Sequence, residues 1–150
     1  MASLLVIAHA PLASALRAVA AHVYPECAAS LEVLDVSADT PVEVVEAQAQ
    51  ALLARMGATE ALILTDVFGA TPCNVAQRLA DGVRVKVVTG VSVPMLWRSL
   101  CYASDPLDKL VARALAGAQQ GTMQVGPSPL HDRTRNMPNA DAKDDRKDQQ

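Results

Sequence analysis

A histidine and an aspartate stand at the ends of two apolar segments of the sequence. His9 directly follows the apolar segment 3–8, and Asp66 lies near the end of the apolar segment 61–67. A carboxylate that holds the Nδ1 proton of an imidazole fixes the ring tautomer and leaves Nε2 free as a nucleophile. The same carboxylate stabilises the positive charge that builds up on the ring during attack. If the two segments are neighbouring strands, His9 and Asp66 form a candidate catalytic pair.

The sequence after Asp66, VFGATPCN at 67–74, predicts a turn of small residues that leads into a helix. Free backbone N–H groups at a helix start bind anions, and the Thr71 hydroxyl adds a further donor. A nucleophilic imidazole, an orienting carboxylate and a phosphate-sized site suit phosphoryl transfer to and from a histidine. The sequence has no G-x-x-x-x-G-K-[ST] loop and no evident carboxylate cluster for magnesium, which disfavours ATP hydrolysis and a metal site.

Each of these features also has a structural interpretation. A histidine after a strand is usually a structural or surface residue, and Asp66 could cap a helix. The Gly-Ala-Thr-Pro turn could be an ordinary one with Thr71 as its N-cap. The joint placement of these residues at one crevice favours the functional interpretation. His22 and His131 are weaker candidates, and Cys73 is interpreted as a small packing residue.

Short apolar segments alternate with segments of helical spacing along most of the chain. Strands are predicted at 3–8, 31–36, 61–67 and 83–89, with a weaker candidate at 121–125. Helices are predicted at 12–24, 41–56, 74–80, 94–102 and 106–116. Thr40, Thr71 and Asp105 each precede a proline near a helix start, so each is a predicted N-cap, and Glu43 completes a capping box with Thr40.

Strand–helix alternation with short loops predicts an α/β fold with a parallel sheet flanked by helices. The most apolar segments fit strands that are covered on both faces. We expect the flavodoxin-like strand order 2-1-3-4, in which the first and third strands are neighbours at the switch point. Ligand sites form beyond the carboxyl ends of such strands. His9 and Asp66 therefore belong to one crevice in this arrangement.

The composition limits the class of protein. The chain has 150 residues, a net charge of -3 and 3% aromatic residues. A weakly acidic chain of one-domain length without a dense basic cluster disfavours nucleic acid as a partner. Three scattered cysteines form no disulfide framework or zinc motif. Neither a signal peptide nor an apolar segment of membrane-spanning length is evident, so we expect a cytoplasmic protein with no direct membrane insertion.

Three sequence motifs match a known family. VIAHAPLASAL at 6–16, DVFGATPCNVA at 66–76 and GVSVPML at 90–96 resemble the EIIA component of the mannose class of the bacterial phosphoenolpyruvate-dependent sugar phosphotransferase system. The motifs occur in the family's order and spacing, and the resemblance covers roughly residues 2 to 125. Transport members often carry glycine and serine where this chain has Ala70 and Thr71, and from this sequence we expect no fused EIIB domain.

The resemblance implies a phosphotransferase that carries a phosphoryl group on a histidine. His9 would accept the group from phospho-HPr, Asp66 would orient the ring, and Thr71 with the backbone of Gly69 and Ala70 would line the phosphate site. No cofactor would be needed, because the donor is already a labile phosphohistidine. A fifth, antiparallel strand would be exchanged between the subunits of a homodimer, and 121–125 is the matching segment.

The predicted domain boundaries follow from the same resemblance and from composition. Residues 1–126 would form the mannose-class EIIA domain. Residues 127–150 are almost entirely polar and carry charges of both signs, so they cannot bury enough surface to offset their ordering entropy. We expect a disordered polar tail at 127–150.

Several functions remain open at this level. The phosphoryl group could pass to an EIIB-type acceptor, or the protein could be a regulatory sensor of an incomplete system that transports no sugar. A dihydroxyacetone-kinase phosphotransfer subunit is a further alternative, although its turn after the aspartate differs. Flavin binding is disfavoured because the loop after the first strand is His9-Ala10-Pro11 and not a Ser/Thr/Gly-rich phosphate loop.

Overall fold

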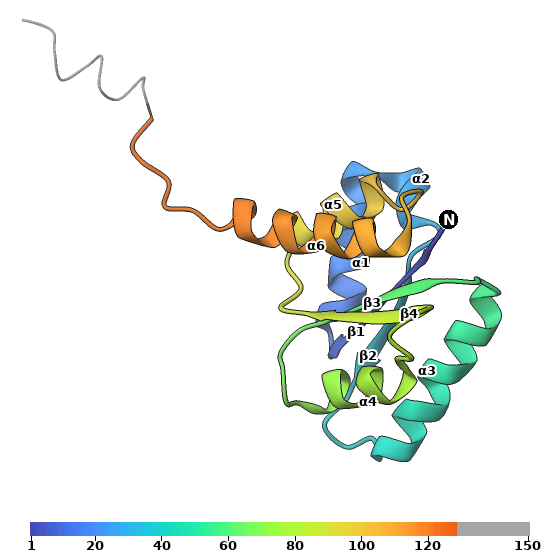
Figure 1. Ribbon diagram of the computed structural model, residues 1–150. Helices are drawn as coiled ribbons and strands as arrows, with labels where there is room; N and C mark the ends of the chain where they lie inside the picture. The colour runs from blue at the N-terminus through green and yellow to red at the C-terminus, as the bar shows by residue number, and fades with distance from the viewer. Residues whose placement is uncertain (129–150) are drawn as a thin grey trace, which may run out of the picture.

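A parallel four-stranded sheet forms the centre of the molecule (Figure 1). The computed structural model describes residues 1–128. The strands are β1 (Ser3–His9), β2 (Glu32–Val36), β3 (Ala61–Thr65) and β4 (Val85–Thr89). Their order in the sheet is β2-β1-β3-β4. The predicted flavodoxin-like order 2-1-3-4 is therefore confirmed.

The pairing register brings the carboxyl ends of the strands to one edge of the sheet. Strand β1 lies between β2 and β3, with His9 opposite Val36 and Ile7 opposite Thr65. Thr65 is in turn opposite Thr89 of β4. The residues that follow β1 and β3 therefore emerge side by side, as the switch-point argument requires.

Helices cover both faces of the sheet (Figure 1). One face packs against α1 (Leu12–Val23), α2 (Pro25–Ala28), α5 (Val93–Cys101) and α6 (Leu107–Gly121). The other face packs against α3 (Val42–Met56) and α4 (Thr71–Leu79). Because each strand alternates its side chains between the two faces, there are two apolar clusters, one on each side of the sheet.

The central strands are buried on both faces, as their sequences predict. All residues of β3 are buried, and β1 is buried from Leu4 to Ala8. Strand β3 is shorter than predicted because the chain leaves the sheet after Thr65. Asp66 and Val67 then begin the loop to α4, and Val67 is half exposed. Asp66 is thus outside the ladder, whereas His9 is paired in it as the last residue of β1.

The C-terminal part of the described chain differs from the prediction. Helix α6 continues to Gly121, beyond the predicted end at 116. The strand predicted at 121–125 is absent from this single chain, in which 122–128 have no regular secondary structure. Met123 and Val125 are exposed there. Exchange of this segment between two subunits stays a prediction. Of the tail predicted at 127–150, residues 129–150 lie outside the described part.

The predicted N-caps before proline are wrong. Helices α3 and α6 begin after Pro41 and Pro106, which are themselves the N-cap residues and have extended ψ values of 144° and 146°. The N-cap of α4 is Ala70, and Thr71 is its first helical residue. None of these three helices has a side-chain cap. The threonine or aspartate before each proline is therefore not in a capping position.

Candidate functional site

His9 is the last residue of β1 and the first exposed residue of that strand. The strand runs through the middle of the sheet, so its backbone is fixed by pairing on both sides. The side chain of His9 is 52% exposed. A rigid backbone combined with an open side chain allows the imidazole to meet another protein without local unfolding.

Asp66 lies directly against His9. Its Oδ2 atom accepts the backbone N–H of His9 at 2.9 Å and lies 2.6 Å from Nδ1 of the ring. Its Oδ1 atom accepts the N–H of Val67 at 2.8 Å. The side chain of Asp66 is only 12% exposed. The structure thus brings together the two residues that the sequence placed at one crevice.

The hydrogen bonds keep Asp66 ionised. Partial burial by itself raises the pKa of this carboxyl, but the N–H and ring of His9 and the N–H of Val67 bond the charged form and lower the pKa overall. An ionised carboxylate can only accept hydrogen bonds, so Nδ1 of His9 carries the ring proton. The Nε2 atom makes no hydrogen bond to any residue in 1–128, so in the neutral ring its lone pair is free.

The loop after Asp66 leads directly into α4. Gly69 has φ +87°, a left-handed conformation that side chains other than glycine rarely adopt. Ala70 is extended, and the carbonyl of Gly69 lies 3.4 Å from the side-chain nitrogen of Asn74. The glycine therefore redirects the chain so that the helix can start beside the sheet.

The start of α4 presents unused donors. The backbone N–H groups of Ala70 and Thr71 precede the first intrahelical bond, which runs from Asn74 to the carbonyl of Ala70. Within the described chain, the Thr71 hydroxyl makes no hydrogen bond, so the capping role considered for it is not observed. Helix α4 contacts both β1 and β3. These donors are therefore on an element that packs against the strands carrying the His9–Asp66 pair.

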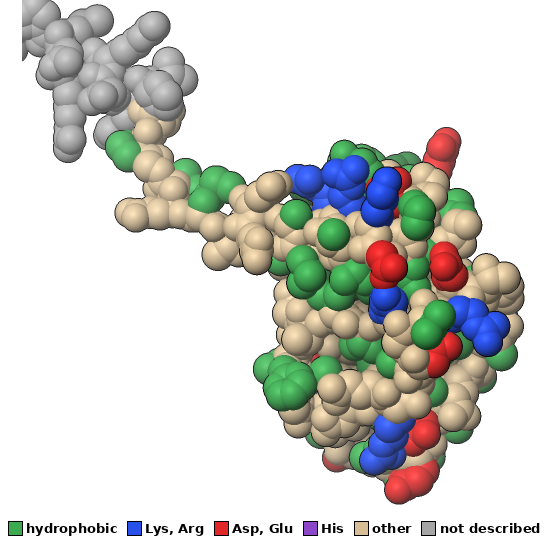
Figure 2. Space-filling model, in the orientation of Figure 1, with side chains coloured by type: hydrophobic (Ala, Val, Ile, Leu, Met, Phe, Trp, Pro, Cys, Tyr) green, Lys and Arg blue, Asp and Glu red, His purple; other side chains and the backbone are tan. Residues whose placement is uncertain are grey.

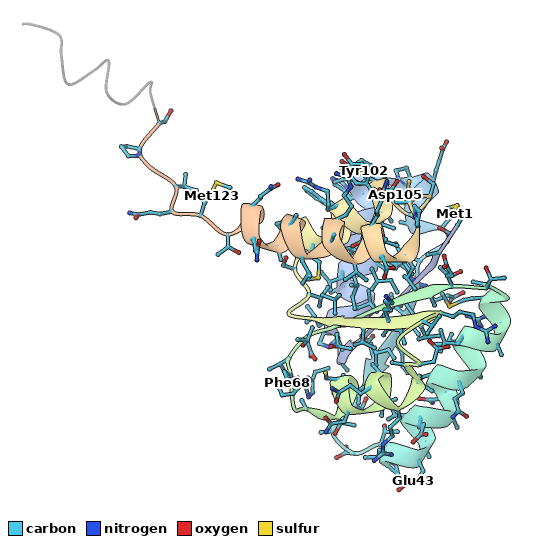
Figure 3. The ribbon with its side chains drawn as sticks, viewed as in Figure 1. Met1, Glu43, Phe68, Tyr102, Asp105 and Met123 are labelled. Carbon is cyan, nitrogen blue, oxygen red and sulfur yellow. The ribbon has the colours of Figure 1, made fainter. Side chains whose placement is uncertain are left out.

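Two apolar side chains project from the same loop. Val67 is 51% exposed and Phe68 is 72% exposed. Figure 3 shows Phe68 pointing outward from the loop between β3 and α4. Exposed large apolar residues next to a polar site are typical of protein-binding surfaces.

The other residues singled out in the sequence lie elsewhere. His22 is in the last turn of α1, and Cys73 is buried in the first turn of α4. The sequence analysis did not single out Asp35 and Ser14, which are hydrogen-bonded to each other at the same edge of the sheet. The available signal was an aspartate near the end of a predicted strand.

A family model matches residues 3–115 of the chain. Its description is the PTS system fructose IIA component, and the family is EIIA-man. No curated protein matches the chain. The match of the family model extends from β1 into α6 and therefore includes every strand and the His9–Asp66 pair.

Solved structures share the fold. A phosphotransferase system component EIIA from Streptococcus agalactiae is 21% identical, with a TM-score of 0.74 over 83% of this chain and 97% of that chain. The mannose/sorbose specific IIA subunit from Enterococcus faecalis is 24% identical, with a TM-score of 0.77 over 85% of this chain and 96% of that one. A sigma-54 interaction domain protein from Enterococcus faecalis is 16% identical, with a TM-score of 0.67 over 80% and 92%.

The family model covers well over half of the chain, and the strand order is that of a flavodoxin-like sheet. The chain therefore belongs to the EIIA-man family, the IIA components that carry phosphoryl groups in the phosphotransferase system.

Proposed function

We propose that this protein is a histidine phosphocarrier, which accepts a phosphoryl group from phospho-HPr on Nε2 of His9 and passes it to an EIIB-type acceptor. The observation that carries the proposal is the 2.6 Å contact between Nδ1 of His9 and Oδ2 of Asp66. This contact supports a proton on Nδ1, which would leave Nε2, on a half-exposed ring, as the nucleophile.

The transfer step follows from this protonation state. The Nε2 lone pair of His9 attacks phosphorus while the P–N bond of the donor phosphohistidine breaks, and that electron pair stays on the donor imidazole. The Nδ1 proton remains on the ring of His9, which becomes positively charged. The carboxylate of Asp66 stabilises this charge, and the reverse sequence delivers the phosphoryl group to the acceptor.

The proposed phosphate site consists of the backbone N–H groups of Gly69, Ala70 and Thr71 together with the Thr71 hydroxyl. These donors precede or begin α4, where the helix dipole favours a negative charge. Small side chains at 69 and 70 allow an anion to approach the backbone closely. Donors that wait in position for the charge of the transition state are an effective form of stabilisation.

The proposal requires no cofactor, since the donor already carries an activated phosphoryl group. The phosphocarrier domain would comprise residues 1–126 and would act as a homodimer in the cytoplasm, with 121–125 exchanged between subunits. Among the described residues, no helix is long and apolar enough to cross a membrane. On the face seen in Figure 2, acidic and basic side chains are interspersed.

A reconstituted phosphorelay tests the proposal. Purified protein is mixed with HPr, the first enzyme of the system and phosphoenolpyruvate, and intact mass is followed over time. Wild-type protein and His22→Ala should gain one phosphoryl group, and His9→Ala should gain none. Labelling of His9→Ala at the wild-type level would remove His9 as the acceptor site.

The onward acceptor is tested in the same relay. Adding candidate EIIB proteins to the labelled protein should move the label to EIIB if the physiological role is sugar transport. If no candidate EIIB takes up the label, the result would favour the regulatory alternative, in which the phosphorylation state itself is the signal. Loss of label to a dihydroxyacetone kinase subunit would support the third alternative.

A further inference from the structure

A second carboxylate lies on the opposite side of the turn that carries His9. Asp35 is on β2, opposite Ala8 of β1, and the next residue, Val36, is opposite His9. Both carboxylate oxygens of Asp35 are bound by one residue. Oδ1 accepts the backbone N–H of Ser14 at 3.1 Å, and Oδ2 accepts the Ser14 hydroxyl at 2.5 Å.

Asp35 serves as the cap of α1. The N-cap residue of this helix is Pro11, which offers no side-chain acceptor. Ser14 is the third helical residue, and its N–H is one of the groups that an N-cap side chain normally accepts. Asp35 provides that acceptor from a different element, and its negative charge lies at the positive end of the helix dipole.

This contact fixes the short connection that carries His9. Only Ala10 and Pro11 separate the end of β1 from the start of α1. The N–H of Ala10 donates to the carbonyl of Val36 at 3.0 Å, so the connection is bonded to β2 both through its backbone and through Ser14. On its other side, the N–H of His9 is bonded to Asp66. The backbone at His9 is thus bonded on one side to Asp66, in the loop after β3, and the chain that follows it is bonded on the other side to β2 through Ala10 and Ser14.

Asp35 acts at a distance from the reacting atoms. Alternate residues of β2 point to opposite faces of the sheet, and Leu31 and Val33 pack in the cluster that includes α1. Asp35 shares their face, whereas Val36 belongs to the cluster on the other face, together with Ile7. By the same alternation, His9 lies on the face of Ile7. A change at Asp35 therefore reaches the imidazole only through the backbone and α1.

We propose that Asp35 and Ser14 are positioning residues for phosphoryl transfer at His9. This inference rests on the proposed function of His9 as the phosphoryl acceptor. With the pair intact, the first turn of α1 and the backbone of His9 stay in register with Asp66. Without it, the start of α1 loses its cap and the imidazole moves relative to the carboxylate. Small misplacements of a reacting group can cost roughly 100-fold in rate.

The test uses matched variants of the full chain. Asp35→Asn and Ser14→Ala weaken or remove the contact, and Ser14→Thr retains the hydroxyl and the N–H. Asp39→Asn is the charge-matched control, because Asp39 is an exposed residue of the turn after β2 and is not one of the two residues in this contact. For each variant, kcat and KM for phospho-HPr are measured in the relay, and the Nδ1 proton of His9 is observed by NMR.

We expect kcat to fall about 10-fold or more in Asp35→Asn and Ser14→Ala while KM changes less than about twofold. The Nδ1 proton signal should shift or broaden in both, and the double variant should be no worse than the poorer single variant. Ser14→Thr and Asp39→Asn should resemble wild type. If Asp35 and Ser14 merely stabilised the fold, kcat and the Nδ1 proton signal would not change together.

Transfer within twofold of wild type in folded Asp35→Asn and Ser14→Ala, with an unchanged Nδ1 signal, would overturn the inference. If Asp35→Asn does not fold, the milder Ser14→Ala decides the question by the same criteria. If wild-type protein accepts no phosphoryl group, the proposed function fails. In that case the Nδ1 signal alone decides whether Asp35 and Ser14 position the ring.

Discussion

One carboxylate oxygen, Oδ2 of Asp66, binds His9 twice, through the backbone N–H at 2.9 Å and through Nδ1 at 2.6 Å. The two contacts fix both the backbone and the ring of the same residue. Because the second oxygen is bonded to the N–H of Val67, the carboxylate itself cannot rotate without losing a bond. The orientation of the imidazole is therefore set before any partner protein arrives.

Asp66→Ala should slow phosphoryl transfer without preventing it. The variant keeps the Nε2 nucleophile but loses the group that fixes the tautomer and stabilises the charged ring. Effects of this kind are typically about 10²- to 10⁴-fold in rate. Rapid-quench intact-mass measurements on phospho-HPr and the variant give the rate directly.

Asp39→Ala is the control for that measurement, because it removes an exposed carboxyl near the same edge of the sheet. It should transfer at the wild-type rate. A wild-type rate in Asp66→Ala itself would mean that the carboxylate does not assist the reaction.

Because of Asp66, the free energy of unfolding should depend on pH in the acid range. Its pKa in the folded protein is lowered below the ordinary value of 3.8. As pH falls below that value, the unfolded chain binds the proton before the folded chain does, so the free energy of unfolding decreases. The stability difference between wild type and Asp66→Asn should be constant above this range and shrink as pH falls through the folded-state pKa. Urea unfolding at a series of pH values measures it.

A variant of Asp81 is the control that distinguishes this effect on stability from an effect on phosphoryl transfer. The N–H groups of Val85, Val83 and Arg84 all donate to its Oδ1 atom and lower its pKa. Asp81→Asn should therefore show an acid-dependent loss of the same sign but transfer phosphoryl groups normally. An unchanged stability difference for Asp66→Asn across the acid range would contradict the proposed ionisation of Asp66.

The Thr71 hydroxyl should contribute to phosphate binding and not to folding. It makes no hydrogen bond within residues 1–128, so Thr71→Val should leave thermal stability nearly unchanged. A hydrogen bond to a charged group is worth about 1.5–3 kcal/mol, which corresponds to roughly 10- to 100-fold in transfer rate. Thr71→Ser keeps the hydroxyl and should remain close to wild type in the relay. Equal rates for the valine and serine variants would exclude this hydroxyl from the reaction.

Phe68 should contribute to partner binding. It is 72% exposed and lies two residues after Asp66, beside the residues proposed to react. Aromatic residues in this setting often carry much of the energy of an interface. Phe68→Ala should raise KM for phospho-HPr by about 10-fold with little change in kcat. An unchanged KM, with Val83→Ala as a control for loss of another exposed apolar side chain, would place the docking surface elsewhere.

The sheet and the His9–Asp66 pair could be predicted because each depends on local pattern and on one topological rule. Fully apolar segments identified β1 and β3, and the parallel arrangement put their carboxyl ends together. The contact between residues 9 and 66 then required only that the two strands be neighbours. A role for Asp35 was not predicted because it depends on the position of the first turn of α1, which the sequence pattern does not give.

The helix ends were predicted less well, for identifiable reasons. A residue before proline is kept out of helical geometry, and Pro41 and Pro106 remain extended themselves, so α3 and α6 begin later than the caps assumed. Among residues 1–128, Ser92 is an N-cap residue whose own side chain caps its helix, since it accepts the N–H of Met95 at 3.3 Å in α5. No glutamate or glutamine follows Ser92 at the capping-box position, so that signal was missing.

Helix α6 continues beyond its predicted end at 116 because the next residue, Gly117, is part of the contact between α6 and α5. A Cβ atom at this position would lie 2.8 Å from Cβ of Arg98 and 3.0 Å from the carbonyl oxygen of Pro94, neither of which is the far end of a flexible side chain. Alanine has a helix propensity about 1 kcal/mol better than glycine, but overpacking costs about 1–3 kcal/mol. Gly117→Ala should therefore lower Tm, whereas Gly126→Ala, with nothing within 4 Å of the added Cβ, should not. Thermal unfolding followed by circular dichroism measures both, and a raised Tm for Gly117→Ala would show that α5 and α6 can separate to admit the methyl group.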